Sequence, residues 1–216
     1  GYSYGQSNEK SKVSYGVKAG INVASYRLNS ESRDQLKEDG SSLLPRISFH
    51  VGGYADLSVT DAFSVQAGLT LSSKGNKVRY SYDDYGFDEE ISGTYTEKLL
   101  YLEVPVNAIY KAGRFYAGAG PYVGYALSGK WKDKGETDYG DGDVESFSDS
   151  DKIEFGGDEG YKRIDFGVNV LAGYQLKSKI SIGVGYGLGL SNMLNRDDNS
   201  WFSKNRVFSL SVGYSF

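Results

Sequence analysis

Two stretches near the end of the chain alternate between apolar and small or polar residues with a strict period of two. From Ile164 to Leu176 most alternate positions are apolar, and glycine or polar residues fill most of the others. After a break at 177–179 the pattern resumes from Ile180 to Leu190, with glycine at positions 183, 185, 187 and 189. Such alternation predicts strands whose two faces meet different surroundings. Both runs exceed the usual five or six residues of a soluble strand and reach the roughly ten needed to cross a bilayer at a tilt.

Six further segments alternate in the same way, namely 13–23, 47–59, 63–71, 100–110, 115–127 and 208–216. The connections are of two kinds. Tight turns lie at 60–62, 111–114 and 177–179, and long polar loops at 27–46, 72–97, 129–163 and 191–205. Short turns on one side and long loops on the other predict an all-β fold, an eight-stranded antiparallel up-and-down transmembrane β-barrel. We expect at most one helical turn, within 28–44.

This pattern also predicts the organisation of the chain. Residues 1–12 form a polar N-terminal extension in the periplasm, and residues 13–216 form the barrel. Both termini then lie on the periplasmic side, and the long loops are extracellular.

Alternation by itself does not tell which face meets lipid, because soluble lipocalin-type barrels also alternate. Here glycines dominate the polar face, and inside a narrow barrel they make room for tyrosines of the same parity: Tyr54, Tyr101, Tyr116 and Tyr122. Aromatic residues also gather at the short-turn ends and predict an interfacial girdle: Phe63, Tyr110, Phe115, Tyr174, Tyr214 and Phe216. We therefore expect Val168 and Ile182 to face lipid, and Asn169 and Gly185 to face the interior.

Composition excludes several classes of function. The net charge is −4 and the cations are scattered, which disfavours nucleic acid as a partner. The chain has no cysteine, so thiolate metal sites, disulfides and thiol catalysis are excluded. It also has no apolar run long enough for a membrane helix.

Several segments resemble a known family. They are Tyr101-Leu102-Glu103-Val104-Pro105-Val106, the run from Gly120 to Lys130, Arg163-Ile164-Asp165-Phe166-Gly167, and the ending from Asn205 to Phe216. They are similar to the outer-membrane β-barrel proteins of Bacteroidetes labelled porin family or PorT-like. The resemblance implies a barrel in the bacterial outer membrane, surrounded by outer-membrane lipid and lipopolysaccharide, and it implies little about activity.

The last three residues, Tyr214-Ser215-Phe216, are similar to the C-terminal signal read by the barrel-assembly machinery. The glycine usual in that signal is replaced by Ser211, with Gly213 nearby. The resemblance therefore implies the assembly machinery as a partner during biogenesis, with Tyr214 and Phe216 as the signal.

By parity, the interior of the barrel holds charged residues of both signs: Lys18, His50 and Arg163, with Asp56, Glu103 and Asp165. Buried charges need partners, so we expect these six to form a polar network that plugs the lumen. A path for protons or ions along Lys18, Glu103 and Asp165 is the alternative. Pro105 and Pro121 lack a ladder donor, and we expect a bulge or a local water at each.

His50 is the only histidine, so any Ser-His site would have to use it. Ser48 lies two positions away on the same face, as a lipid A deacylase or acyltransferase would require. Both side chains face inward, however, where a lipid chain does not reach. We therefore predict no catalytic residues and no cofactor.

The third long loop alternates carboxylates with glycines, and Asp141, Asp143 and Glu145 are weak candidates for a calcium site. The pattern of an EF-hand is absent, and a solvated acidic loop is the favoured interpretation of these residues.

Taken together, the residues predict a non-catalytic outer-membrane barrel. Its role is structural, with recognition through acidic, tyrosine-rich loops, or it serves as an accessory subunit that binds a protein partner in a larger outer-membrane complex. A lipid A-modifying enzyme and a narrow small-solute channel are the alternatives.

Overall fold

The computed structural model describes residues 13–84, 89–140, 142–156, 160–194 and 203–216; the extension predicted for 1–12 lies outside them. These residues form eleven strands and one helix. In chain order the elements are β1 (Val13–Leu28), α1 (Ser30–Glu38), β2 (Ser42–Leu44), β3 (Arg46–Ser58), β4 (Phe63–Lys74), β5 (Lys77–Asp84), β6 (Glu89–Ala112), β7 (Phe115–Asp138), β8 (Val144–Lys152), β9 (Ile164–Gln175), β10 (Ile180–Gly189) and β11 (Ser203–Ser215).

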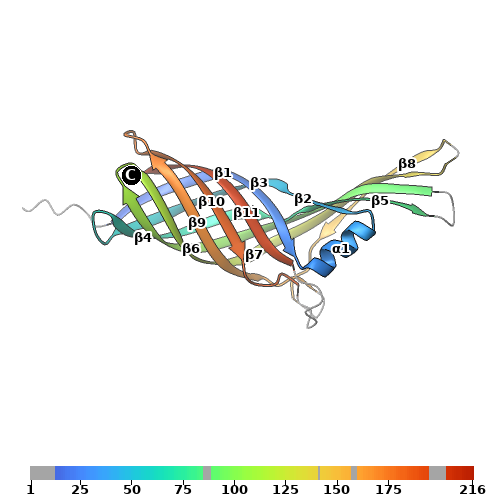
Figure 1. Cartoon of the computed structure of the whole chain (residues 1–216), viewed down its shortest axis with the longest axis horizontal. Coiled ribbons are helices and arrows are strands. Elements are labelled where there is room, and N and C mark those ends of the chain that lie inside the picture. The colour runs from blue at the N-terminus through green and yellow to red at the C-terminus, as the bar shows by residue number, and fades with distance from the viewer. Residues whose placement is uncertain (1–12, 85–88, 141, 157–159, 195–202) are drawn as a thin grey trace, which may run out of the picture.

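Eight of the strands close into an antiparallel ring, in which each strand pairs with the ring strand on either side of it (Figure 1). The order around the ring is β1-β3-β4-β6-β7-β9-β10-β11, and β11 pairs back onto β1 in a register that places Ile21 opposite Leu210. Each alternating segment of the sequence corresponds to one of these strands, and no segment extends more than one residue past the end of its strand. Closure leaves the ring without a free edge, so its backbone polar groups are paired between strands.

The three predicted tight turns connect β3 to β4, β6 to β7 and β9 to β10 at one rim of the ring, where the C-terminus also lies (Figure 1). The Thr60 hydroxyl accepts the backbone N–H of Phe63 at 3.0 Å and closes the first turn. Gly113 and Lys179 adopt positive φ angles of 64° in the other two. We call this end the short-turn rim.

Apolar side chains cover the outer face of the ring. Val168 and Ile182 are 42% and 51% exposed, whereas Asn169 and Gly185 line the interior. The predicted inward and outward directions of these side chains are therefore confirmed. The aromatic residues predicted at the short-turn rim meet in pairs on this outer surface, with ring centroids 5.0 Å apart for Phe63 and Tyr110 and 4.9 Å apart for Phe115 and Tyr174.

Glycines on the inner face leave room for tyrosines, as expected. A Cβ atom added at Gly16 would overlap the ring of Tyr54, and one added at Gly173 would overlap the hydroxyl of Tyr116. The alternation of glycine and tyrosine thus fills a narrow interior without steric conflict.

The loops predicted at 72–97 and 129–163 are largely strands, which corrects the expectation. Strand β4 continues to Lys74, and β6 and β7 are each 24 residues long. Beyond the ring, β5 pairs with the first part of β6, and β8 pairs with the last part of β7. The result is a sheet that extends well beyond the ring (Figure 1). We call it the projecting sheet: β5, residues 89–98 of β6, residues 130–138 of β7, and β8.

The segment 27–46 contains α1, nine residues long, where at most one turn was expected. The side chain of Asn29 caps it by accepting the backbone N–H of Ser32 at 3.0 Å. Among the described residues, no helix has the length and apolar character needed to cross a membrane.

The expected bulges at the prolines are not found. The ladder is interrupted opposite Pro105 and Pro121, but its register is the same on both sides of each gap. The register shift between β6 and β7 falls instead at Leu100/Tyr101. It lies at the junction between the ring and the projecting sheet, where added twist reorients the two long strands.

Candidate functional site

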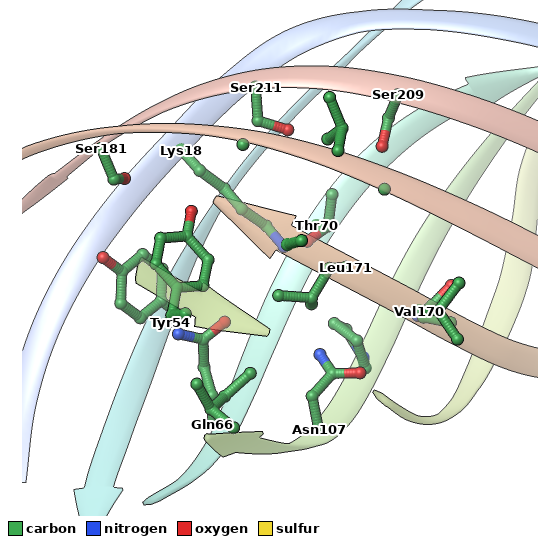
Figure 2. A pocket seen from close by; sticks show the side chains of 18 of the residues that line it. Lys18, Tyr54, Gln66, Thr70, Asn107, Val170, Leu171, Ser181, Ser209 and Ser211 are labelled. Atoms are coloured by element: carbon green, nitrogen blue, oxygen red, sulfur yellow. The ribbon is translucent and has the colours of Figure 1, made fainter. Parts of the chain in front are cut away.

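The interior of the ring holds a cavity of about 410 Å³. It extends from the short-turn rim, where Lys111, Arg114 and Phe216 line it, to Lys74 and Tyr122 deeper in the ring. Polar side chains including Lys18, Gln66 and Ser211 border it between these ends (Figure 2).

Lys74 is the centre of a buried ionic cluster at the deep end of the cavity. Its Nζ lies 2.5 Å from the Glu103 carboxylate and 2.8 Å from Asp165 Oδ2. Asp165, only 1% exposed, also accepts hydrogen bonds from Ser191 at 2.7 Å and Asn205 at 2.8 Å. Because its members come from β4, β6, β9 and β11, this cluster ties together distant parts of the ring.

A mostly aromatic and apolar cluster lies beyond Lys74, at the end of the ring opposite the short turns. Its buried members are Tyr26, Leu99, Tyr101, Ala126, Ile153 and Met193, with Trp131, Phe155 and Tyr161 packed against them. The hydroxyl of Tyr161 donates a hydrogen bond to Glu97, and burial raises the pKa of this carboxyl group. This aromatic cluster and the Lys74 cluster pack across the interior, so in the described structure the cavity reaches the short-turn rim and not the opposite rim.

A hydrogen-bonded chain runs from Asn22 through His50 to Ser211. The Asn22 amide nitrogen donates to the carbonyl of Phe49 at 3.1 Å, so its Oδ1 faces His50 Nδ1 at 2.8 Å and accepts. Nδ1 therefore carries the imidazole hydrogen, and Nε2 accepts from the Ser211 hydroxyl at 2.9 Å. In this arrangement the Ser211 hydroxyl donates its hydrogen to an unprotonated imidazole nitrogen, which is also the arrangement in hydrolases that use a Ser-His pair.

Asp56 forms a third group near the short-turn rim. Lys111 Nζ lies 2.8 Å from Asp56 Oδ1, and the Ser64 hydroxyl donates to Oδ2 at 3.1 Å. Lys18, half-buried, lines the cavity between these groups and forms no ion pair with any described carboxylate.

A family model described as an outer membrane protein beta-barrel domain matches residues 4–195. The chain belongs to this family. The all-β antiparallel fold is therefore that of a bacterial outer-membrane barrel, and the cavity is the lumen of the barrel.

Several solved structures match this chain over most of its length at low identity. The attachment invasion locus protein Ail of Yersinia pestis is 14% identical with a TM-score of 0.43, and the match covers 95% of this chain and 99% of Ail. Neisserial surface protein A is 12% identical with a TM-score of 0.41, over 94% of this chain and 97% of that one. OprG of Pseudomonas aeruginosa is 10% identical with a TM-score of 0.33, over 94% and 95%. No curated protein matches the sequence.

The barrel does not assemble the predicted charged residues into one network. Glu103 and Asp165 meet through Lys74, Asp56 pairs with Lys111, and His50 belongs to a separate chain of neutral groups. Ser211, and not the predicted Ser48, is the hydroxyl that reaches the imidazole. Ser48 donates instead to the carbonyl of Ser73 at 2.6 Å.

The prediction was wrong for Arg163, whose side chain is exposed. The guanidinium donates to the Ala126 carbonyl at 3.3 Å and lies 4.9 Å from the ring centroid of Phe155. Strand β9 begins only at Ile164, so the alternation that would direct residue 163 inward no longer holds.

Lys74 was missed because residues 72–97 were predicted to form a loop. The available signal was the continued alternation of Thr70, Ser72 and Lys74 on the inner face of β4.

The candidate calcium ligands do not converge in the part of the chain that the structure describes. Asp141 lies outside that part, and Glu145 accepts the hydroxyl of Tyr139 at 3.0 Å. No described group of three or more acidic or histidine side chains has the arrangement of a metal site.

Proposed function

We propose that the ring is an eight-stranded transmembrane barrel of the outer membrane with a non-catalytic role. Its short-turn rim and termini face the periplasm, and the projecting sheet is extracellular. The protein contributes to envelope structure and to recognition at the cell surface, by itself or as an accessory subunit of a larger complex.

One observation carries the proposal: the outer face of the ring is apolar all the way round. Ile21, Leu69, Val123 and Ile182 come from every second strand around the ring, β1, β4, β7 and β10, and are 53%, 53%, 52% and 51% exposed. Soluble monomers rarely expose contiguous apolar patches beyond a few hundred Å². Lipid is the surrounding that removes this surface from water, and the ring closure satisfies the backbone in lipid.

The projecting sheet supports the recognition part of the proposal. Strand β8 is an edge strand that pairs only with β7, and such edges offer backbone groups to an added strand. Aromatic side chains lie on one face of this sheet, where Tyr95 stacks on Trp131 with ring centroids 5.8 Å apart. Tyr and Trp at such positions are typical anchors for protein partners.

Protease accessibility in outer-membrane vesicles tests the placement. A cleavage site inserted after Ser148 in β8 is expected to be cut from outside, and one inserted after Asp61 is expected to be protected until the membrane is permeabilised. The opposite pattern overturns the orientation, and recovery of the folded chain in the soluble fraction overturns the membrane proposal.

Cross-linking followed by purification in mild detergent tests the subunit proposal. A defined protein should co-purify with the barrel and be lost when β8 is deleted. If the barrel elutes alone under every condition, the accessory-subunit role is excluded and recognition is left to the barrel itself.

The hydrogen bonds that link Asn22, His50 and Ser211 favour a hydrolase as the second candidate function. Against it, Ser211 is paired on both sides, with Gly20 and Gly183, so its backbone N–H is engaged in the ladder and does not form an oxyanion hole. Lipid A from strains that overexpress the protein and from strains that lack it should be identical by mass spectrometry. A mass change that disappears with both H50A and S211A establishes the hydrolase instead.

A further inference from the structure

The outward face of the projecting sheet carries a dense group of cations. Cross-strand pairing places them in three successive rows: Lys98 beside Lys130 and Lys152, Lys77 in line with Lys132, and Arg79 in line with Lys134. Residues directly opposite in an antiparallel ladder share one face of the sheet. We call these seven side chains the basic face.

The basic face has no carboxylate of its own. The other positions in its three rows are Thr96, Ser150, Thr94 and Ser148. Among the described residues, none of the seven cations forms an ion pair. The charges of Lys134, Lys130 and Lys98, together with partial desolvation, lower the pKa of Lys132, as expected for unneutralised neighbours.

Crowding like charges on adjacent strands destabilises a sheet, so the arrangement needs an external counter-charge. Nearby acidic side chains do not provide it, because Asp133 and Asp151 have the opposite parity and lie on the other face. An anionic ligand that spans several rows is the complement that this surface fits.

The position of the basic face identifies where that ligand comes from. The outward residues of β6 read Val104, Leu102, Leu100 and then Lys98. The first cations therefore lie two residues, or about 7 Å along the strand, beyond the last leucine of the apolar band. This is the level of the lipid headgroups when the apolar band lies in hydrocarbon.

A ligand from solution would meet a different surface first. Towards the tip of the projecting sheet the same face becomes acidic, with Glu136, Glu90 and Asp138. Acidic residues at the tip repel a soluble polyanion, whereas the lysines nearest the barrel are in reach of the membrane surface.

We propose that the basic face binds the phosphate groups of the outer-leaflet glycolipid next to the barrel. Several lysines neutralise phosphates of adjacent lipid molecules, and the bound lipids fix the projecting sheet relative to the membrane surface. The proposal rests on the transmembrane placement proposed above.

Binding of purified lipid A to the barrel in neutral detergent, counted by native mass spectrometry, tests the inference. The variant K98Q/K130Q/K132Q removes three charges from the basic face, and R33Q/K37Q/K162Q removes three exposed charges elsewhere on the long-loop side. Wild type and control should retain phosphorylated lipid A, and the first variant should bind it about tenfold more weakly, since each cation near an anionic surface contributes to affinity. Dephosphorylated lipid A should bind weakly to all three proteins.

Equal retention of phosphorylated lipid A by the two triple variants overturns the proposal, as does equal binding of phosphorylated and dephosphorylated lipid A. Binding of a soluble sulfated polysaccharide to the basic face, with no preference for phosphorylated lipid A, also overturns it and assigns the surface to a soluble polyanion. Insertion of the wild-type barrel into zwitterionic vesicles is measured separately. Failure to insert contradicts the transmembrane placement, whereas insertion without lipid A selectivity contradicts this inference alone.

Discussion

Lys74 shows how a single side chain organises the interior of the barrel. It is 3% exposed, and its ammonium group lies between two carboxylates from different strands and 4.4 Å from the ring centroid of Tyr122. A buried ion is tolerated only when its partners are all in place, so the group acts as a unit.

The substitution K74M is expected to destabilise the barrel by roughly 3–5 kcal/mol, because it leaves Asp165 buried without its cation. Urea unfolding in lipid vesicles, followed by the migration of unboiled samples in gels, measures the free energy of unfolding. K37M serves as the control, since its side chain is 68% exposed and pairs only with Asp34. An equal free energy of unfolding for K74M and wild type would contradict the structural role of the cluster.

At the scale of elements, β9 illustrates how the two faces of one strand meet different surroundings, the outside of the ring and the lumen. Val168 faces outward and Asn169 faces the lumen, although they are consecutive residues. A substitution at an outward position of such a strand therefore tests what surrounds the ring.

The substitution V168R is expected to cost roughly 2–4 kcal/mol of stability in a bilayer, because it places a charge in the middle of the apolar band. V168L should have little effect, since it keeps an apolar surface there. Unfolding titrations in vesicles compare the two variants with wild type. A tolerated V168R together with a damaging V168L would mean that this face packs against protein and not against lipid.

The cluster beyond Lys74 is expected to depend on pH through Glu97, which lies past the apolar band. Burial raises the pKa of Glu97, so the folded cluster binds the proton more tightly than the unfolded segment does. The stability that it contributes is therefore complete below the ordinary glutamate pKa and is lost as pH rises through the raised value. Amide hydrogen exchange of residues 153–156 should show less protection at higher pH, and E97Q should remove this dependence. A dependence that persists in E97Q would assign it to another group.

At the scale of the whole molecule, the lumen does not form an open path in the described structure. Its cavity reaches the short-turn rim, while the Lys74 cluster and the aromatic cluster pack across the other end. An eight-stranded barrel has little room beyond its own side chains.

In planar bilayers the wild-type protein is therefore expected to show no discrete conductance steps. Membranes that contain a known pore-forming outer-membrane protein at equal protein load provide the positive control for insertion and detection. Reproducible steps of one size would contradict the closed lumen and support the narrow-channel alternative.

The sequence alone determined the ring. Period-two alternation has a fixed geometric consequence, because successive side chains of a strand point to opposite faces. The eight segments, the three tight turns, the gathering of aromatic residues at the short-turn rim and the tyrosines next to glycines were predictable for this reason. The family match is consistent with that prediction.

Only the tertiary structure decided what lies beyond the ring and how the charged groups are partnered. In residues 72–97 and 129–163 the alternation is weak, because tyrosines such as Tyr80 and Tyr82 stand among many charged and polar residues, and such a composition is also typical of a polar loop. Lys74, Ser211 and the rows of the basic face depend on register between strands distant in sequence, which hydrogen bonding across the sheet sets and local residue pattern does not.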